Sequence, residues 1–171
     1  RQRQMCIRDR VKMKRFSRHN ELDQLLQQNH LTADMIKEFA EYLANIHQQA
    51  PPVATHSYYG SWESIRRTTQ DNFDQLLSLL PDTAHQKQLT ELESWSHSHL
   101  DSLLDLITRR KEQGYIRECH GDVHLANMVW FNEKPLLFDC IEFNDNFRCI
   151  DVINDAAFLL MDLEDRNAKP L

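Results

Sequence analysis

The chain has 171 residues, of which 41% are hydrophobic, and this is enough to form the core of one globular domain. Its formal net charge is -6 and charges of both signs are mixed along the sequence, so a surface dedicated to nucleic acid or to an anionic membrane is not expected. The four cysteines form no C-x-x-C pair, and no apolar run approaches the ~20 residues that cross a bilayer. We therefore expect a soluble, cytoplasmic protein without nucleic-acid or membrane partners.

The two ends of the sequence differ from its middle. Residues 1–10 carry four arginines but no hydrophobic pattern, which indicates a non-native or junction segment. Residues 11–165 are expected to form the folded domain, and residues 166–171 a truncated tail. At the start of the domain, apolar and basic residues alternate over 11–16, and this period predicts a short strand with a basic outer face.

Two helices are predicted to follow. The first covers residues 21–28, with Asn20 as its N-cap. The second begins at Thr32, and two prolines, Pro51 and Pro52, lie just beyond its end. The apolar residues of the second helix recur at helical spacing: Met35, Ile36, Phe39, Leu43 and Ile46.

The middle of the chain predicts two longer helices. A polar and aromatic loop over 53–62 leads into a helix from about 63 to 80, where Pro81 ends it. One long helix is expected from 82 to 113, with Gly114 in the favoured position after its end. The leucine-rich stripe of this helix and the tryptophans are expected to pack in the core or between helices; the tryptophans are Trp62, Trp95 and Trp130.

Beyond Gly114 the pattern changes to short extended segments. Residues 115–119 form an extended run, and two apolar segments, 128–131 and 136–138, are separated by turn residues that predict a hairpin. Asp151 is expected to cap a last helix. Its predicted buried residues are Val152, Ala156, Leu159, Leu160 and Leu163. The fold class is therefore α+β, predominantly α-helical, with one small β-hairpin.

The motif with the clearest chemistry lies between the extended run and the hairpin. It has the form H-x-D-x-x-x-x-N, with His120, Asp122 and Asn127 at its defined positions, and Asp139 follows at the end of the second hairpin strand. Phosphoryl transfer needs an aspartate that accepts the proton of the acceptor hydroxyl and oxygen ligands for magnesium. We expect the hairpin to bring Asp122, Asn127 and Asp139 to one open cleft.

This motif resembles the H-G-D-x-H-x-x-N loop of the aminoglycoside phosphotransferase family, whose members share the protein-kinase-like fold. Residues 137–143, with 150–152 and 155–157, are similar to a bacterial subgroup in which this domain is often fused to a P-loop ATPase-like domain. The resemblance implies a kinase-like C-terminal lobe over 11–165. It also implies a phosphotransferase that uses ATP and Mg2+ to phosphorylate a small-molecule hydroxyl acceptor.

The resemblance also implies roles for individual residues. Asp122 would be the catalytic base, and Asn127 and Asp139 would bind magnesium and thereby the nucleotide. His120 and Asp155 would support the loop. From the residues alone, His120 is better explained as a packed histidine that bonds nearby backbone, and Asp155 as an acceptor for loop N–H groups.

The sequence departs from this family in its N-terminal part. A complete member has a β-rich N-terminal lobe with a phosphate-covering loop and a lysine that pairs with the phosphates. The only glycines are Gly60, Gly114 and Gly121, and they form no cluster that could cradle a phosphate. We therefore expect the N-terminal lobe to be largely absent and the chain alone to be inactive.

Two other functions remain open at this point. The order Gly121, Asp122, Val123, His124 resembles the D-x-H start of metal-dependent phosphoesterases, although no histidine occurs after Asn127 to complete a two-metal site. A truncated lobe could instead be non-catalytic and bind a partner through the surface that a second lobe would cover. Glu142 could add to a metal or substrate site, although an exposed loop carboxylate explains it better. The sequence does not indicate which acceptor is used.

Overall fold

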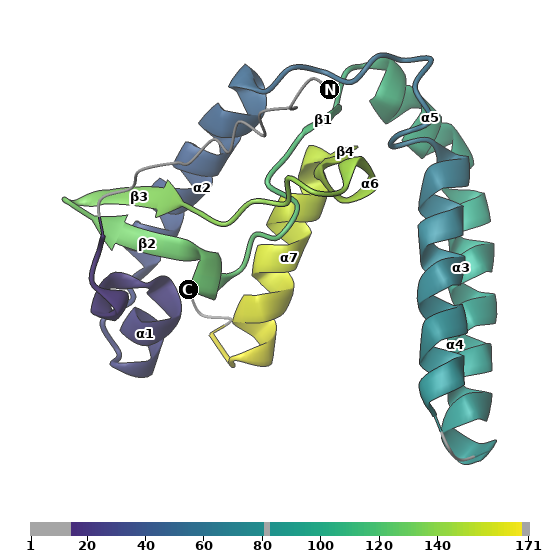
Figure 1. Cartoon of the computed structure of the whole chain (residues 1–171), viewed down its shortest axis with the longest axis horizontal. Helices are drawn as coiled ribbons and strands as arrows, with labels where there is room; N and C mark the ends of the chain where they lie inside the picture. The colour runs from purple at the N-terminus through teal and green to yellow at the C-terminus, as the bar shows by residue number, and fades with distance from the viewer. Residues whose placement is uncertain (1–14, 81–82, 169–171) are drawn as a thin grey trace, which may run out of the picture.

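The computed structural model describes residues 15–80 and 83–168. The expected junction segment 1–10, most of the strand expected over 11–16 and the end of the expected tail lie outside these ranges; Arg15 and Phe16 belong to no strand. Figure 1 shows two parts: a mixed region of helices and two small sheets, and a long helical hairpin that projects from it. None of the helices in the described ranges is long and apolar enough to cross a membrane.

The first part of the chain supplies one wall of the core. A short 3-10 helix, Arg18–Asn20, precedes α1, Leu22–Gln27, and then α2, Ala33–Gln49. Both α-helices were predicted, but Glu21 rather than Asn20 occupies the N-cap of α1. At α2 the Thr32 hydroxyl accepts a hydrogen bond from the amide of Met35, which satisfies one of the free N–H groups of the first turn.

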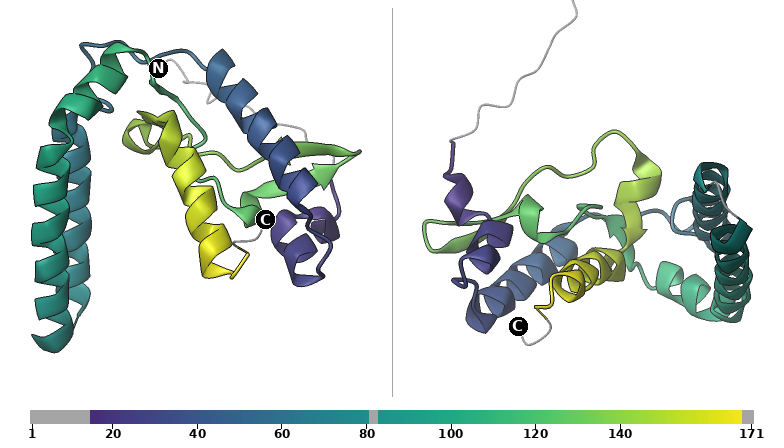
Figure 2. Two further views of the ribbon diagram at one scale, coloured as in Figure 1. Left: turned by 180° about the vertical axis from the view of Figure 1, so that it is seen from behind. Right: turned by 90° about the horizontal axis from the view of Figure 1, so that it is seen from below.

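The projecting part consists of α3, Trp62–Leu79, and α4, Thr83–Ser102, which lie side by side in both views of Figure 2. The prediction of one helix over 82–113 is wrong, because the chain bends at Leu103 and continues as α5, Leu104–Glu112. No proline or glycine marks this bend in the sequence. After the bend, two basic residues of α5 make long-range hydrogen bonds. Arg110 donates to the Asp151 carboxylate, and Lys111 donates to the carbonyl of Tyr59.

The packing expected for the stripe on α4 fails at two of its residues, Trp95 and Leu92. Trp95 is 62% exposed and stacks only on the ring of His99, and Leu92 is also exposed. Both side chains lie on a helix that contacts one neighbour, α3, along most of its length, so the stripe has no second layer to pack against. Trp62 differs, since it is half-buried and donates from its indole nitrogen to the carbonyl of Leu100.

Two antiparallel pairs of strands hold the region around the motif. β1, Ile116–Glu118, pairs with β4, Cys149–Asp151, and β2, Met128–Phe131, pairs with β3, Lys134–Leu137. The β2–β3 pair is the predicted hairpin, whereas the pairing of β1 with a strand some thirty residues later was not predicted. Between β1 and β2 lies the segment 119–127, whose end forms a short 3-10 helix, Leu125–Asn127.

The chain ends with a short helix, α6, Asp145–Arg148, and with α7, Val152–Asp165. As predicted, Asp151 caps α7, and its carboxylate accepts from the amide of Ile153. Leu160, expected on the buried side of α7, is 64% exposed. The core collects side chains from α1, α2, the 119–127 segment and α7; its buried members include Leu22, Phe39, Leu43, Val123, Leu125, Met128, Leu159 and Leu163.

Candidate active site

The segment 119–124 contains the histidine and aspartate of the motif and is called the catalytic loop from here on, after the role that the motif predicts. It is held in a conformation that requires a glycine. Gly121 has a φ of +86°, in the left-handed region that side chains disfavour. A Cβ atom at this position would lie 2.5 Å from the carbonyl oxygen of Phe147 on α6. The loop therefore packs backbone to backbone against α6, and this contact fixes the position of the residues on either side of Gly121.

Asp155 holds the same loop from the other side. Its carboxylate is 1% exposed and comes from the first turn of α7. One oxygen accepts from the amide of Gly121 at 2.9 Å, and the other accepts from the amide of His120 at 3.1 Å. A buried carboxylate is costly unless it is hydrogen-bonded, so these N–H groups and the carboxylate stabilise each other.

A third donor to Asp155 comes from a distant helix. The Nε2 atom of His47, near the end of α2, lies 2.8 Å from the carboxylate, and the His47 side chain is 11% exposed. Sequence reasoning missed this residue. A signal was present, because His47 follows Phe39 and Leu43 at steps of four and therefore continues the buried face of α2.

Cys119 lies beside this pair. One ligand atom from each of His47, Cys119 and Asp155 lies within 4.8 Å of the others, a spacing that could hold a metal ion. Burial and the nearby negative charge of Asp155 raise the pKa of the Cys119 thiol, so in the absence of a bound cation the thiol stays protonated. Asp155 is also already fully engaged by N–H donors. We therefore interpret His47 and Asp155 as a hydrogen-bonded support of the loop, beside which the Cys119 thiol donates to the carbonyl of Ile150.

His120 is a buried residue whose two ring nitrogens are both engaged by backbone. Nε2 lies 2.8 Å from the carbonyl oxygen of Phe138, which can only accept, so this nitrogen carries the proton. Nδ1 accepts from the amide of Asp122 at 3.3 Å. The ring is therefore neutral and ties the catalytic loop to the end of β3; it has no free nitrogen for catalysis.

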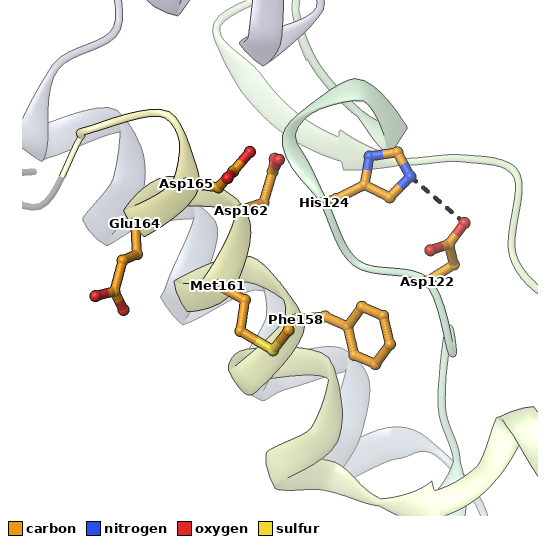
Figure 3. Close-up of a pocket in the computed structure, with 7 residues that line it drawn as sticks. All are labelled: Asp122, His124, Phe158, Met161, Asp162, Glu164 and Asp165. Atoms are coloured by element: carbon orange, nitrogen blue, oxygen red, sulfur yellow. Dashed lines mark ion pairs between the residues drawn. The ribbon is translucent and has the colours of Figure 1, made fainter. Parts of the chain in front are cut away.

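Asp122 is the one acidic residue of the loop, and its side chain is 41% exposed. Its carboxylate accepts from the amide nitrogen of Asn127 at 3.1 Å and lies 3.4 Å from Nε2 of His124. Figure 3 shows the His124 ring and the Asp122 carboxylate facing each other across the turn of the loop. His124 in turn caps the short 3-10 helix through Nδ1. The carboxylate is thus oriented by two neighbours and still open to solvent.

Asn127 is buried and is turned toward Asp122 by its own amide group. The amide nitrogen donates both to the Asp122 backbone carbonyl at 3.0 Å and to its carboxylate. Because the side-chain nitrogen of Asn127 makes both of these bonds, its side-chain oxygen is the atom that can bind another partner. Asn127 and Asp122 are therefore held together by hydrogen bonds.

Asp139 follows β3 by two residues in an uncommon conformation. Its φ is +60°, which is unusual for a residue that is not glycine, and its side chain is exposed. The backbone on both sides is fixed to the loop region: Phe138 donates to the carbonyl of Asn127, and Ile141 donates to the carbonyl of His120. Strain of this kind is often retained at functional sites.

Two hollows flank Asp122, and neither is lined by Asn127 or Asp139. Asn127 is linked to Asp122 by a hydrogen bond, and the common cleft expected for Asp122, Asn127 and Asp139 stays a prediction. The first hollow, of about 670 Å3, lies against the second half of α7 (Figure 3). The second, of about 470 Å3, lies between the catalytic loop, α3, α6 and the start of α7. Glu142 is exposed and lines neither hollow.

Basic residues of α5 fix two walls of the second hollow. Arg110 makes two hydrogen bonds to the Asp151 carboxylate, at 2.6 and 2.7 Å. Lys111 donates to the carbonyls of Ser57 and Tyr59, which lie in the loop before α3. Burial lowers the pKa of Lys111, with nearby Glu63 partly opposing this. Sequence reasoning missed both residues, since basic residues at a helix end are common without a tertiary role.

Comparison with known proteins agrees with the resemblance of the motif to that of phosphotransferases. A model of the phosphotransferase enzyme family matches residues 15–170. Uncharacterized proteins from Mycobacterium bovis and from two strains of Mycobacterium tuberculosis are 30% identical over 132 residues. The alignment covers 77% of this chain but 26% of those proteins, so the chain spans about a quarter of their length. No solved structure matches the chain significantly.

Proposed function

The chain belongs to the phosphotransferase enzyme family, and on this premise we propose that it provides the catalytic loop of an ATP-dependent small-molecule kinase. In the proposed reaction, the oxygen of an acceptor hydroxyl attacks the γ-phosphorus of ATP. The new P–O bond forms as the bond to the β-phosphate oxygen breaks, ADP leaves, and the hydroxyl proton passes to the protein.

The observation that carries this proposal is the arrangement of Asp122. Its carboxylate is open to solvent at the meeting point of two hollows, and the amide of Asn127 fixes its orientation. An aspartate in this position can accept the proton of a hydroxyl that lies within hydrogen-bonding distance. His120 does not compete for this role, because both of its ring nitrogens are bonded to backbone. Asp122 is therefore the proposed catalytic base.

Magnesium would be held by the oxygen atoms of Asn127 and Asp139. The donor set fits: Mg2+ takes oxygen ligands, usually one or two carboxylates together with phosphate oxygens and water. The amide nitrogen of Asn127 is engaged by Asp122, which leaves the carbonyl oxygen as its available group. The ion, when bound, neutralises charge on the nucleotide phosphates. His120 and Asp155 would serve as the supports that keep the loop in place.

The remaining parts of the proposal concern the longer protein. No glycine-rich phosphate loop can be recognised in this sequence, so we propose that a second, N-terminal lobe covers the nucleotide phosphates and that the chain alone transfers slowly. We also propose that a P-loop ATPase-like domain follows this region in the longer protein. ATP chemistry also fits a cytoplasmic setting.

A pair of substitutions in a longer protein that contains such a lobe tests the proposal. Asp122→Asn keeps the shape of the side chain but removes the proton acceptor, so nucleotide binding should persist while turnover falls by about 10²-fold or more. Asp139→Asn removes a proposed magnesium ligand, so it should weaken binding of the metal–ATP complex and lower turnover together. Both variants are assayed for ADP release and for nucleotide affinity across a magnesium titration.

The two roles make opposite predictions for added magnesium. Excess magnesium should partly restore Asp139→Asn and should leave Asp122→Asn unchanged. Glu142→Gln is the matched control, since Glu142 is an exposed carboxylate in the same segment as Asp139 and lines neither hollow. Near-normal turnover of Asp122→Asn would rule out the proposed base.

A further inference from the structure

The hollow between α3 and the catalytic loop has features that define the kind of molecule it accepts. We propose that the phosphoryl acceptor is an uncharged, polyhydroxylated molecule of about the size of a sugar, bound in this hollow with one hydroxyl at Asp122. This inference rests on the proposed phosphotransferase function, but the charge and shape of the hollow argue for it separately.

The hollow surrounds a ligand from several directions. Its volume of about 470 Å3 lies in the range of small-molecule pockets. Its walls come from α3, the catalytic loop, the segment 141–147 and the start of α7. Lys111 and Arg110 stabilise two of these walls through the loop before α3 and through Asp151. A site built on elements fixed in this way can position a hydroxyl precisely against Asp122.

The charges of the lining exclude most ionic ligands. No lysine or arginine lines this hollow within the described part of the chain, so an acceptor with a phosphate or carboxylate group would find no counter-ion there. Two carboxylates line it, those of Asp122 and Asp151. Asp151 is fully occupied, since it accepts two hydrogen bonds from Arg110 and one from the amide of Ile153. An ammonium group would therefore have only the proposed base as its partner.

The uncharged groups of the lining fit a molecule with many hydroxyls. Thr68 and Asn72 on α3 face the same hollow as Asn154 on α7, and hydroxyl and amide side chains can both donate to and accept from hydroxyl groups. Phe147 and Phe158 add apolar surface, against which the C–H faces of a sugar ring can pack. A few convergent polar groups within an apolar lining are typical of small-molecule sites.

The hollow on the other side of Asp122 would favour a different ligand. Three further carboxylates line it, those of Asp162, Glu164 and Asp165, and Figure 3 shows them along the second half of α7. Its lining comes from only two segments, the catalytic loop and α7, so it would enclose a ligand less completely. Asp162 is also engaged by the amide of Leu125 and by Arg166. A cationic acceptor would have to bind here, and this is the competing outcome of the test.

The test uses three sugars that share one ring and differ in charge. The chain, isotopically labelled for amide NMR, is titrated without ATP with glucose, glucosamine and glucuronate at up to tens of millimolar. Glucose should shift amide signals of α3 and α7 residues that line the hollow. Glucosamine and glucuronate should bind at least about tenfold more weakly than glucose. The ammonium of glucosamine could pair only with Asp122, which in the proposed pose binds a hydroxyl, and the carboxylate of glucuronate would find no cation in the lining.

Two matched substitutions locate the binding. Thr68→Val keeps the size of the side chain but removes its hydroxyl, so glucose should bind about three- to tenfold more weakly, the usual effect of one lost hydrogen bond. Thr90→Val makes the same change on α4, away from the hollow, and should have no effect. Arg110→Gln releases Asp151 and should raise glucosamine affinity about tenfold. If Arg110→Gln disturbs the fold, the two threonine variants decide alone.

The outcomes separate this inference from the proposed reaction. Tighter binding of glucosamine than of glucose would overturn the inference, and so would the absence of glucose-induced shifts at α3 and α7. Neither result would affect the assays of Asp122 and Asp139 in the longer protein. Conversely, an Asp122→Asn enzyme with normal turnover would reject the proposed reaction while sugar binding to the hollow stood unchanged.

Discussion

Gly121 has no room for a side chain in the catalytic loop. Both causes of intolerance apply to it: its φ of +86° disfavours any side chain, and an added Cβ would lie 2.5 Å from the carbonyl oxygen of Phe147. The atom in the way belongs to the backbone of α6, which cannot rotate aside as the end of a side chain could. Gly121→Ala should therefore lower the free energy of unfolding by more than about 3 kcal/mol.

Gly114→Ala is the matched control for this prediction. Gly114 has a similar φ, +77°, but its added Cβ would meet only the Cβ of Pro52 at an ordinary 3.8 Å. Backbone strain alone should cost about 1–2 kcal/mol there. Urea unfolding followed by circular dichroism measures both variants. If the free energy of unfolding falls by the same amount in both variants, the backbone of α6 moves away from an added Cβ more easily than the structure indicates.

At the scale of residues, the sequence predicted which residues belong to the candidate site better than it predicted their hydrogen-bond partners. The H-x-D-x-x-x-x-N spacing predicted that Asp122 and Asn127 would lie together, and they do, because five residues on one turn cannot separate far. The third partner of Asp155, His47, is 108 positions away, and no local pattern encodes such a pairing. Asp139 was expected in the same cleft as Asp122, but its backbone conformation depends on bonds from its neighbours to the loop, which the sequence does not reveal.

Among the elements, the β2–β3 hairpin carries a strained turn that can be improved. The two turn residues, Asn132 and Glu133, have φ values of +51° and +58°. Asparagine adopts this region more readily than glutamate does, and glycine is the preferred second residue of such a turn. Glu133→Gly should therefore raise the free energy of unfolding by about 1 kcal/mol.

Glu133→Ala distinguishes the backbone effect from the loss of charge. Alanine removes the carboxylate but retains a Cβ and hence the strain, so its stability should lie within about 0.5 kcal/mol of the unchanged chain. Both variants are compared by urea unfolding at the same ionic strength. An alanine variant as stable as the glycine variant would show that charge, not backbone strain, limits this turn.

Predictions of elements succeeded where the signal was local. The hairpin follows from turn residues between two apolar segments, and α2 follows from a Thr cap and helical spacing. The bend at Leu103 that separates α4 from α5 has no such signal. Beyond the bend, Arg110 and Lys111 bind Asp151 and the loop before α3, and these contacts are tertiary. The pairing of β1 with β4 was missed for the same reason.

For the molecule as a whole, the sequence predicted a mostly helical α+β fold but not how unevenly the helices are buried. Amphipathic spacing indicates that a helix has an apolar face, but not whether another element covers that face. The core lies around α1, α2, the catalytic loop and α7. The α3–α4 hairpin lies apart from it, as Figures 1 and 2 show, and apolar residues such as Trp95 and Leu79 remain exposed there.

This uneven burial predicts that the α3–α4 hairpin opens without the rest of the protein. Within the described part of α4, residues 84–102, no side chain is fully buried, and α3 buries only Ser64 and Phe73. Polar contacts between the helices, such as Arg66 with Asp101 and Gln70 with Glu93, are exposed or half-buried and add little. Segments with few buried apolar contacts open locally at lower free energy than the core.

Hydrogen exchange followed by mass spectrometry can measure this difference. Amides in the outer halves of α3 and α4 should exchange at least about tenfold faster than those in the middle of α7, because local opening precedes global unfolding there. Peptides from α2 provide the internal reference, since Phe39 and Leu43 lie in the core. Glucose at saturation should slow exchange near Thr68 and leave the tip of the hairpin unchanged, because only the first turns of α3 line the proposed acceptor site. Equal exchange across α3, α4 and α7 would mean that the hairpin and the core unfold as one cooperative unit.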